Sequence, residues 1–556
     1  MKKIGKAVLG LIAAVAMLFT GLVAPVTAMA AADYSITIGT QAKPVTKDHT
    51  FEAYQVFAGD LSEQGSDVTL SNISWGNGVK GDELLDALKK DATLGGTFTN
   101  ATGAADVAAA LTADNAAAFA KVAAAHLTAT ASGTGAYDAD AQTYTISGLD
   151  AGYYLVKDKD DSLGDKTEAY TEFILQVVKN VTVAPKADVP TVEKKVWDTN
   201  DSATDTNDPN DDKWSDSADH DINDTVAFQL TGSLPSNYDA YTTYAYTFTD
   251  TLSKGLTLDQ YSIKVYAVKG TGDQQTKTEI KKLDAAGNDG YTVATAPYGN
   301  DTTPDTDKYK GGTVLTISFA DLKQAAAATD DETLAIDKDT KIVVEYSATL
   351  NENAVIGAAG NPNKVDLTFS NNPNGTGEGK TPEDVVTVFT FKIVANKVDE
   401  NNKALEGAGF TLYKYNKNST ADDKYEAVGS EIKGDAMTQF TFSGLDAGQY
   451  KLEETTTPAG YNTWEGLEFK IVAEHDATAD DPQLKTLKFT DLNGNDINDF
   501  TVDQNKDGGS IDVVNKKGSN LPETGGIGTT ILYVAGAVCV AAAGLWFGLR
   551  RRNSTR

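Results

Sequence analysis

Two lysines lie in strand-like segments where side-chain alternation turns them toward an apolar face. In residues 391–399, period-two alternation places Lys397 on the same side as phenylalanine, isoleucine and alanine. In residues 190–196, it places Lys194 inward, with Lys195 as the alternative. A lysine amine enclosed by apolar side chains is poorly solvated as a cation, so it loses its proton and becomes a nucleophile. Both segments therefore offer candidate amine nucleophiles.

An acidic motif near the C-terminus gives the first of these lysines a partner. Residues 450–461 resemble the E-box of sortase-assembled pilins, usually written YxLxETxAPxGY, with Thr457 standing where alanine is usual. The resemblance implies that Glu454 promotes an intramolecular amide bond between Lys397 and Asn515, on the first and last strands of one domain. A buried acid of this kind stays protonated, polarises the carboxamide and carries the proton as ammonia leaves.

A second set of residues resembles the middle domain of the same family. The strand that contains Asp250 looks like the strand whose acid promotes the bond there. The resemblance implies an amide between Lys194, or Lys195, and an asparagine on the last strand of the domain. Asn371 is in phase with the apolar residues before it, and Asn372 is the alternative.

The C-terminal end resembles the cell-wall sorting signal of Gram-positive surface proteins. A short motif precedes an uncharged segment, residues 526–549, and a basic tail, residues 550–556. A segment of this length can cross a bilayer as a helix, and the arginines hold its end in the cytoplasm. The resemblance implies that a sortase cleaves after Thr524 and passes its acyl group to an amine. The motif, at residues 519–525, contains Leu521, Pro522, Glu523, Thr524 and Gly525.

The N-terminal end predicts export. Residues 1–30 combine a basic start, an apolar run and a small-residue cleavage site, which is typical of a secretory signal peptide.

Farther along, residues 181–186 resemble the pilin motif, whose core is VxVYPK, with Ala184 in place of tyrosine. The resemblance implies that the Lys186 amine attacks the sortase-held Thr524 of the next subunit. Such a head-to-tail contact does not close, so it propagates as a filament.

Composition excludes several classes of protein. The chain has 556 residues, with 48 Lys and Arg against 79 Asp and Glu, a formal net charge of −31. This charge repels phosphate backbones and argues against general nucleic-acid binding. Cys539 is the single cysteine, so intramolecular disulfides are impossible and an exported chain needs other stabilisation. The four histidines are scattered and the sequence contains no nucleotide-binding motif, so we expect a protein that is not an enzyme and binds no cofactor or metal. The acidic segments 198–224 and 503–514 match an EF-hand calcium loop poorly.

The interior predicts a mainly β protein. Alternating runs such as residues 225–230, 312–319 and 341–346 indicate strands with one buried face. We expect tandem Ig-like, collagen-adhesin-type β-sandwiches, with helical insertions at 82–88 and 104–127 in the N-terminal domain. The predicted domains are an N-terminal domain at 31–186, a middle domain at 187–382 and a C-terminal, collagen-adhesin B-type domain at 383–518.

An internal repeat relates the first and last of these domains. Residues 147–158 match residues 443–454, which aligns Asp158 with Glu454 and predicts a shared fold. The first strand of the N-terminal domain, residues 34–38, has no lysine, which argues against a third amide there.

The resemblance covers the chain from signal peptide to sorting signal and implies the backbone subunit of a sortase-assembled pilus. The implied partners are identical subunits, a pilus-type sortase, a housekeeping sortase, peptidoglycan and tip or minor pilins. The implied location is a wall-anchored surface fimbria that supports adhesion. A monomeric wall-anchored adhesin, which would not use Lys186, is the alternative.

Overall fold

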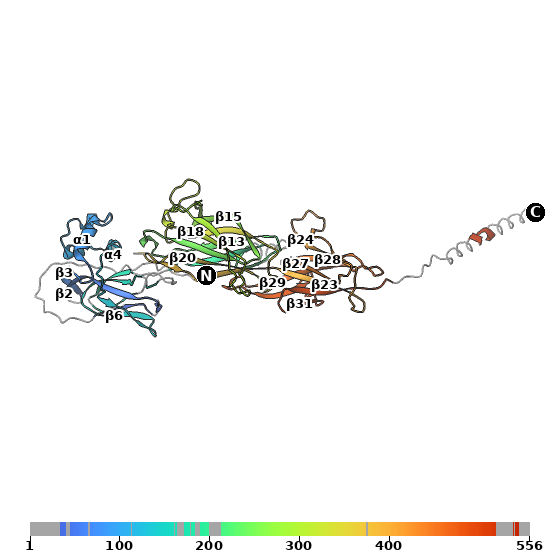
Figure 1. Cartoon of the computed structure of the whole chain (residues 1–556), viewed down its shortest axis with the longest axis horizontal. Coiled ribbons are helices and arrows are strands. Elements are labelled where there is room, and N and C mark those ends of the chain that lie inside the picture. The colour runs from blue at the N-terminus through green and yellow to red at the C-terminus, as the bar shows by residue number, and fades with distance from the viewer. Residues whose placement is uncertain are drawn as a thin grey trace, which may run out of the picture.

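The computed structural model describes residues 34–40, 45–64, 67–112, 114–160, 162–163, 172–177, 179–183, 189–199, 213–373, 376–518, 537–538 and 540–543. Those between residues 34 and 518 form three β-sandwiches in a row, in the order of the chain (Figure 1). The predicted signal peptide, Lys186 and the sorting motif lie outside the described residues. Among the residues described, no helix is long and apolar enough to cross a membrane.

The N-terminal sandwich combines two sheets with a small helical layer. Its apolar core includes Ile36, Phe51 and Ile146 from facing strands, and the helices bury Leu84 and Phe119 against the second sheet. One sheet has the order β5(Ala136–Asp138), β6(Thr143–Leu149), β1(Tyr34–Ile38), β9(Val181–Val183). The other has β3(Asp67–Trp75), β2(Phe51–Gln64), β7(Gly152–Asp158), β8(Glu172–Val177), with β4(Gly133–Thr134) on β2. The helices are α1(Gly81–Lys90), α2(Gly95–Phe98), α3(Ala104–Ala110) and α4(Ala116–Ala124).

The middle sandwich is the largest and has its own continuous core. One sheet has the order β11(Lys213–Ser215), β10(Val192–Asp198), β13(Thr225–Gly232), β19(Lys341–Leu350), β15(Leu256–Lys269), β16(Thr276–Glu279). The other has β12(Ser217–Asp219), β22(Asp384–Phe389), β20(Asn361–Ser370), β14(Tyr246–Leu252), β18(Thr313–Phe319), β17(Thr292–Pro297), with β21(Glu378–Lys380) on β20. The 3₁₀ helices are η1(Tyr238–Ala240), η2(Gly272–Gln274) and η3(Leu322–Gln324).

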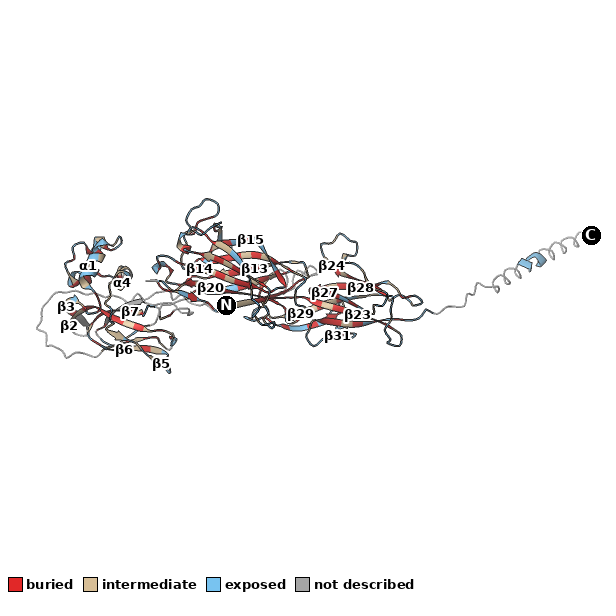
Figure 2. Ribbon diagram, in the orientation of Figure 1, coloured by how far each residue is buried: buried red, intermediate tan, exposed pale blue. Residues whose placement is uncertain are grey.

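The C-terminal sandwich encloses a third core, rich in phenylalanine. Buried residues lie along its facing strands, as they do in the other two sandwiches (Figure 2). One sheet has the order β27(Gln439–Leu445), β23(Phe391–Asp399), β32(Gly508–Asn515), β31(Phe500–Val502). The other has β25(Tyr425–Ala427), β24(Gly409–Tyr415), β28(Gly448–Thr456), β29(Leu467–His475), β30(Leu484–Thr490), with β26(Ile432–Lys433) on β24.

The predicted mainly β architecture is confirmed, with two local corrections. The helical stretch expected at 104–127 is two helices, α3 and α4, because the chain leaves the helix at Leu111. The middle domain does not end at residue 382, because β22 pairs with β20 and β12 of the middle sandwich. The Asn, Gly and Pro cluster at 371–382 therefore connects strands of one sandwich and does not link two domains.

The internal repeat corresponds to a shared topology. The matching segments form the consecutive strands β6 and β7, and β27 and β28, and in each case the chain crosses from one sheet of the sandwich to the other. In each sandwich the first strand pairs in parallel with a later one, β1 with β9 and β23 with β32. Gly148 and Gly444 hold the same place near the ends of β6 and β27, with φ of 75° and 78°, a conformation that favours glycine. The first and third sandwiches are therefore built on one plan.

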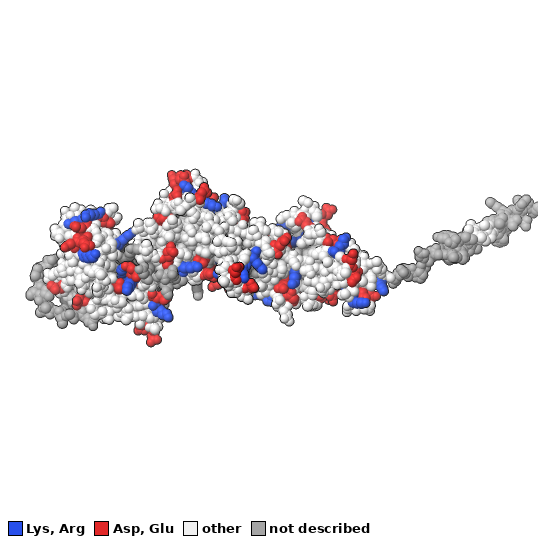
Figure 3. All heavy atoms as spheres, viewed as in Figure 1, with Lys and Arg blue, Asp and Glu red and all other residues white. Residues whose placement is uncertain are grey.

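Surface charges are scattered in small mixed groups on the face shown in Figure 3, without one extended basic area. This distribution agrees with the net negative charge of the sequence. It gives a polyanion no continuous surface on that face.

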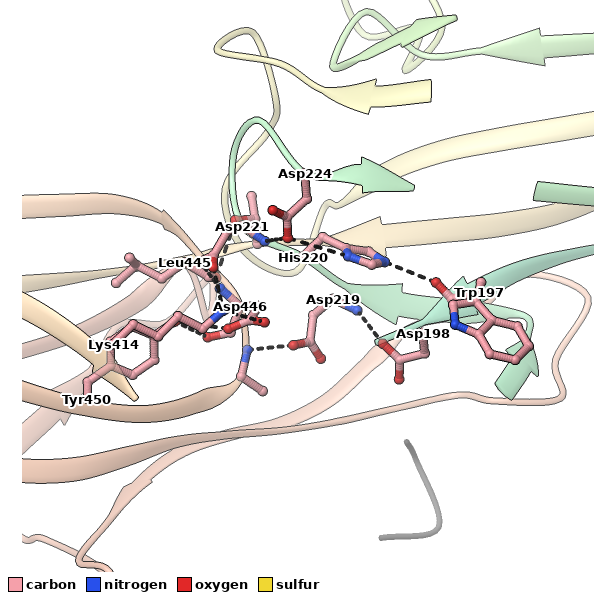
Figure 4. A network of polar contacts seen from close by, with 12 residues as sticks. Trp197, Asp198, Asp219, His220, Asp221, Asp224, Lys414, Leu445, Asp446 and Tyr450 are labelled. Atoms are coloured by element: carbon pink, nitrogen blue, oxygen red, sulfur yellow. Dashed lines mark hydrogen bonds and ion pairs between the residues drawn. The ribbon is translucent and has the colours of Figure 1, made fainter. Parts of the chain in front are cut away.

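A polar network joins the middle and C-terminal sandwiches (Figure 4). The backbone N–H groups of Asp446 and Ala447 donate to Asp221 Oδ1 at 3.0 Å and Asp219 Oδ1 at 2.5 Å. Lys414 pairs with Asp221 across the joint and with Asp446, at 2.9 Å, in its own sandwich. Because these bonds connect buried groups of both sandwiches, we expect the two to behave as one rigid unit.

The stability of this joint should depend on pH. Burial opposes the charged form of His475, but its hydrogen bond to Asp219 and the charges of Asp219 and Asp198 raise its pKa above the usual value, against a small opposing effect of Lys213. Burial and the charge of Asp219 raise the pKa of Asp198 to about 7. Burial likewise opposes protonation of His220, yet its hydrogen bond to Asp224 raises its pKa.

All three shifts mean that the folded joint binds more protons than the unfolded chain between pH 5 and 8. Stability should therefore fall as pH rises through this window, at about 1.4 kcal/mol per pH unit for each proton taken up. Thermal unfolding of the full chain from pH 5 to 8 measures the slope. We expect His475→Gln to reduce the dependence of stability on pH, and His126→Gln, in the N-terminal sandwich, to leave it unchanged. An equal slope of stability against pH in both variants would contradict the assignment of this dependence to the joint.

Candidate amide-forming sites

The C-terminal sandwich brings its three predicted residues together inside the core. β23 and β32 run in parallel, with Lys397 level with Val513 and Asp399 level with Asn515. The period-two alternation turns both Lys397 and Asn515 inward, where they are fully buried. Glu454 comes from β28 of the opposite sheet and its side chain is also buried. An amine, an acid and a carboxamide thus share one enclosed space.

Glu454 is the centre of this site. Asn515 Nδ2 donates to both of its carboxylate oxygens, at 2.7 and 2.9 Å, and the backbone N–H of Trp464 donates to Oε2 at 2.7 Å. Lys397 Nζ lies 3.9 Å from Oε1 and donates to the Val513 carbonyl at 2.7 Å. Within the described part of the chain, Asn515 Oδ1 is buried without a hydrogen-bond partner. The acid therefore contacts both groups that would react.

Burial prepares Lys397 to act as a nucleophile. It lowers the pKa of Lys397 to about 8, although the charge of Glu454 works in the opposite direction. About a tenth of the amine is therefore neutral near pH 7, compared with a negligible fraction for an exposed lysine. A neutral amine at this position can attack the Asn515 side-chain carbonyl, and the acid can transfer the proton that ammonia needs to leave.

In the middle sandwich, the structure distinguishes Lys194 from Lys195. Lys194 is completely buried, and its Nζ contacts Asp250 Oδ2. Lys195 points to the surface, where it pairs with Asp216 at 2.5 Å and with Glu193 at 3.1 Å. The inward assignment of Lys194 is confirmed, and the partly exposed Lys195 lies in an ion-pair group with Asp216 and Glu193.

Asn371 does not lie at this site. The β14–β20 register places Asp250 level with Val365. The backbone N–H of Lys194 donates to Asp384 Oδ2 at 2.6 Å, and Asp384 is also level with Val365. Asn371 is six positions farther along, about 20 Å at the rise of a strand. The predicted pairing of Lys194 with Asn371, or with its neighbour Asn372, is therefore wrong.

Asn363 takes the place expected for Asn371. It lies on β20 at the level of Leu252 and is buried, and its Nδ2 donates to Tyr346 Oη at 2.7 Å. Lys194 Nζ donates to the same hydroxyl at 3.0 Å. Because side chains alternate with period two, Asn363 on β20 and Asn371, one residue past its end, are in phase, so the sequence carried the signal for both positions.

Burial shifts the pKa of both charged groups in the middle site toward neutrality. It lowers the pKa of Lys194, against the charge and hydrogen bond of Asp250. It raises the pKa of Asp250, against the charge and hydrogen bond of Lys194. A proton that moves from the ammonium to the carboxylate removes two buried charges at once, which favours a neutral amine beside a neutral acid.

The N-terminal sandwich has a different pair at the equivalent position. Asp158 on β7 is level with Phe51, as Glu454 on β28 is level with Phe410. Here the acid meets His49, whose Nδ1 lies 2.8 Å from Asp158 Oδ1 with both side chains buried. The first strand, β1, carries no lysine, and the absence of a third amide in this sandwich stays a prediction.

The acidic loop at 503–507 holds a lysine. Lys392 Nζ lies 3.5 Å from Asp507 Oδ2 and 3.9 Å from Asp503 Oδ2. Asp507 N–H also donates to Asp503 Oδ1 at 2.8 Å, which closes the loop on itself. In the described parts of the chain, no group of three or more His, Cys, Asp or Glu residues is placed to hold a metal ion.

Two segments of the chain match known family models. Residues 391–483, which include Lys397 and Glu454, match the SpaA family, a prealbumin-like fold domain. Residues 513–555, which include Asn515 and Thr524, match the LPXTG cell wall anchor motif. Both matches fall on the regions where the sequence predicted an E-box domain and a sorting signal.

The chain is also similar to a surface protein of Streptococcus pyogenes. It is 28% identical over 268 residues to the trypsin-resistant surface T6 protein of Streptococcus pyogenes serotype M6, which covers 38% of this chain and 48% of that protein. The alignment thus spans about half the length of this relative.

The chain is also similar to solved structures of pilins over most of its length. The T6 backbone pilin of S. pyogenes is 17% identical, with a TM-score of 0.47, and covers 89% of this chain and 100% of that one. The major pilin SpaD of Corynebacterium diphtheriae is 19% identical, with a TM-score of 0.42, and covers 88% and 98%.

Proposed function

We propose that this chain is the backbone subunit of a covalent pilus, polymerised by a sortase and anchored in the cell wall of a Gram-positive bacterium. One observation carries the proposal: two consecutive sandwiches each bury a lysine and an asparagine around one acid. Such sites have no use in substrate turnover, because they are closed to solvent and their product stays in the chain. The LPXTG anchor match gives the same chain a route to the wall.

In each site the lysine amine attacks the carboxamide carbon of the asparagine. The nitrogen of Lys397 bonds to the side-chain carbon of Asn515, the proton passes through Glu454, and ammonia leaves. The middle sandwich forms the corresponding bond between Lys194 and Asn363, with Asp250 as the acid. The arrangement is supported by the burial of all six side chains and by the contacts of each acid.

The two amide bonds let tension on the fibre bypass most residues of the middle and C-terminal sandwiches. A pull on the middle sandwich passes from Lys194 to Asn363 and leaves the strands between them unloaded. A pull on the C-terminal sandwich passes from Lys397 to Asn515 in the same way. Since the chain cannot form disulfides, these amides are its means of covalent stabilisation.

Subunits join through Lys186 and Thr524. A pilus-type sortase cleaves after Thr524 and transfers its acyl group to the Lys186 amine of the neighbouring subunit, giving a head-to-tail fibre. A housekeeping sortase then attaches the last subunit to peptidoglycan, and minor pilins complete the fibre. The chain is a structural protein and a sortase substrate, and its fibre supports adhesion.

The test is an immunoblot of wall protein released by muramidase and boiled in SDS. We expect a ladder of high-mass species for the wild type that collapses to monomer for Lys186→Ala. Lys179→Ala removes an exposed lysine nearby and should leave the ladder intact. Monomer alone in the wild type would refute the pilus and favour a wall-anchored adhesin, and a ladder that survives Lys186→Ala would refute the role of this lysine.

A further inference from the structure

The hydroxyl of Tyr346 lies at the centre of the middle site. It is 3.0 Å from Lys194 Nζ, 3.1 Å from Asp250 Oδ2 and 2.7 Å from Asn363 Nδ2. These are the amine, the acid and the nitrogen that would leave as ammonia. One oxygen thus contacts every group that exchanges a proton in the reaction.

Packing fixes this hydroxyl in place. Tyr346 is on β19, level with Phe228 of β13, and the two rings stack with centroids 5.4 Å apart and an interplanar angle of 19°. The ring is buried, and Lys194 Nζ lies over both rings, 5.3 and 5.4 Å from their centroids. Burial and then the charge of Asp250 raise the pKa of Tyr346 well above its usual value, so the hydroxyl keeps its proton.

The C-terminal site shows why the middle site needs this group. There Glu454 accepts hydrogen bonds from Asn515 Nδ2 through both carboxylate oxygens. Asp250 is one methylene shorter, and Asn363 Nδ2 meets the tyrosine hydroxyl, which in turn meets Asp250. The hydroxyl therefore spans the distance that the longer acid covers by itself.

We propose that Tyr346 is a catalytic residue of the middle sandwich, which holds the Asn363 carboxamide and passes a proton to its departing nitrogen. The inference rests on the Lys194–Asn363 bond proposed above. The neutral Lys194 amine bonds to the carboxamide carbon, and the Asn363 nitrogen becomes tetrahedral and regains a localised lone pair. This nitrogen accepts the Tyr346 proton, the protonated Asp250 replaces that proton, and Asp250 then takes a proton from the now positively charged Lys194 nitrogen. The carbon–nitrogen bond breaks, ammonia leaves, and acid and hydroxyl end as they began.

The experiment follows amide formation over time in the full chain after synthesis. Digestion under denaturing conditions and mass spectrometry quantify the linked peptides of each sandwich. For Tyr346→Phe we expect the Lys194–Asn363 link to form about 100-fold more slowly, as for the loss of a general acid. The Lys397–Asn515 link in the same molecules is the internal reference and should form at its normal rate.

Tyr244→Phe is the matched control. Tyr244 is buried in the same core, and its hydroxyl has no hydrogen-bond partner among the described residues, so its removal should not slow either link. Equal rates for wild type and Tyr346→Phe would overturn the proposal. Absence of the Lys194–Asn363 link from the wild type itself would instead refute the proposed bond.

A second variant serves if Tyr346→Phe fails to fold. Fluorotyrosine at position 346 keeps the ring and the hydroxyl but makes the hydroxyl a stronger acid. We expect it to change the rate of the middle link and not that of the C-terminal link. An unchanged rate for the middle link would overturn the proton-transfer role.

Discussion

Glu454→Gln is expected to leave Lys397 and Asn515 unlinked. Glutamine has nearly the shape of glutamate, but it cannot take a proton from the amine and return it to the leaving nitrogen. Because each amide releases one ammonia, the wild-type protein should be lighter than its sequence by two ammonia masses and the variant by one. Mass spectrometry of the intact chain and of its peptides measures this difference directly.

The same variant should lose much of the stability of its C-terminal sandwich. A covalent link that closes a loop of roughly 120 residues stabilises a fold by about 4–5 kcal/mol in the chain-entropy description. For a domain of this size the loss corresponds to a fall in Tm of about 15–20 °C, visible by calorimetry.

Glu453→Gln is the matched control for this prediction. Glu453 is the neighbouring residue on β28, but it points to the surface, where it pairs with Lys451 at 3.2 Å. Its variant should retain both ammonia losses and the wild-type Tm. A Glu454→Gln protein that still contains the Lys397–Asn515 link would show that the acid is dispensable.

Alternation and the resemblance to the E-box together were sufficient to find the C-terminal site. Lys397 and Asn515 stand on regular strands, so their apolar neighbours define the buried face without ambiguity. The E-box motif then supplied the acid, and the three side chains meet as expected. The same reasoning favoured Lys194 over Lys195, and the structure decides between them, because only Lys194 is fully buried.

The alternation of buried and exposed side chains did not identify the correct asparagine of the middle site, because that choice depends on the register between two paired strands. Asn363 on β20 and Asn371, one residue past its end, are in phase, and only the pairing with β14 shows which of them lies near the level of Asp250. The boundary at residue 382 was misplaced at the same point of the chain. A cluster of Asn, Gly and Pro indicates a turn, but its composition does not tell whether the next strand returns to the same sheet.

Other features depend on tertiary packing alone. A strand at 341–346 was predicted, yet nothing in it marks Tyr346 as a partner of residues on three other strands. The His49–Asp158 pair and the joint around Asp219 likewise combine residues that are far apart in the sequence. Such contacts follow from how sheets face each other, and a single sequence carries no pattern for them.

Asn363→Ala should abolish the link in the middle sandwich, whereas Asn371→Ala should retain it. Alanine removes the carbon that Lys194 attacks in the first variant and leaves Asn363 in place in the second. Peptide mass spectrometry should show one ammonia loss fewer in Asn363→Ala than in the wild type and the same losses in Asn371→Ala, with the Lys397–Asn515 link unchanged in both. If Asn371→Ala lost the link and Asn363→Ala kept it, the register of β14 and β20 could not be that of the linked protein.

The position of this bond also decides which part of the subunit bears load. With links at Asn363 and Lys397, tension passes through the segment between them, which includes the end of β20 and all of β22. This segment of about 34 residues can extend to roughly 120 Å, whereas a link at Asn371 would leave about 26 residues and roughly 90 Å. Single-molecule pulling distinguishes the two lengths. In Asn363→Ala the whole middle sandwich should unfold under force, because no covalent bond then bypasses it.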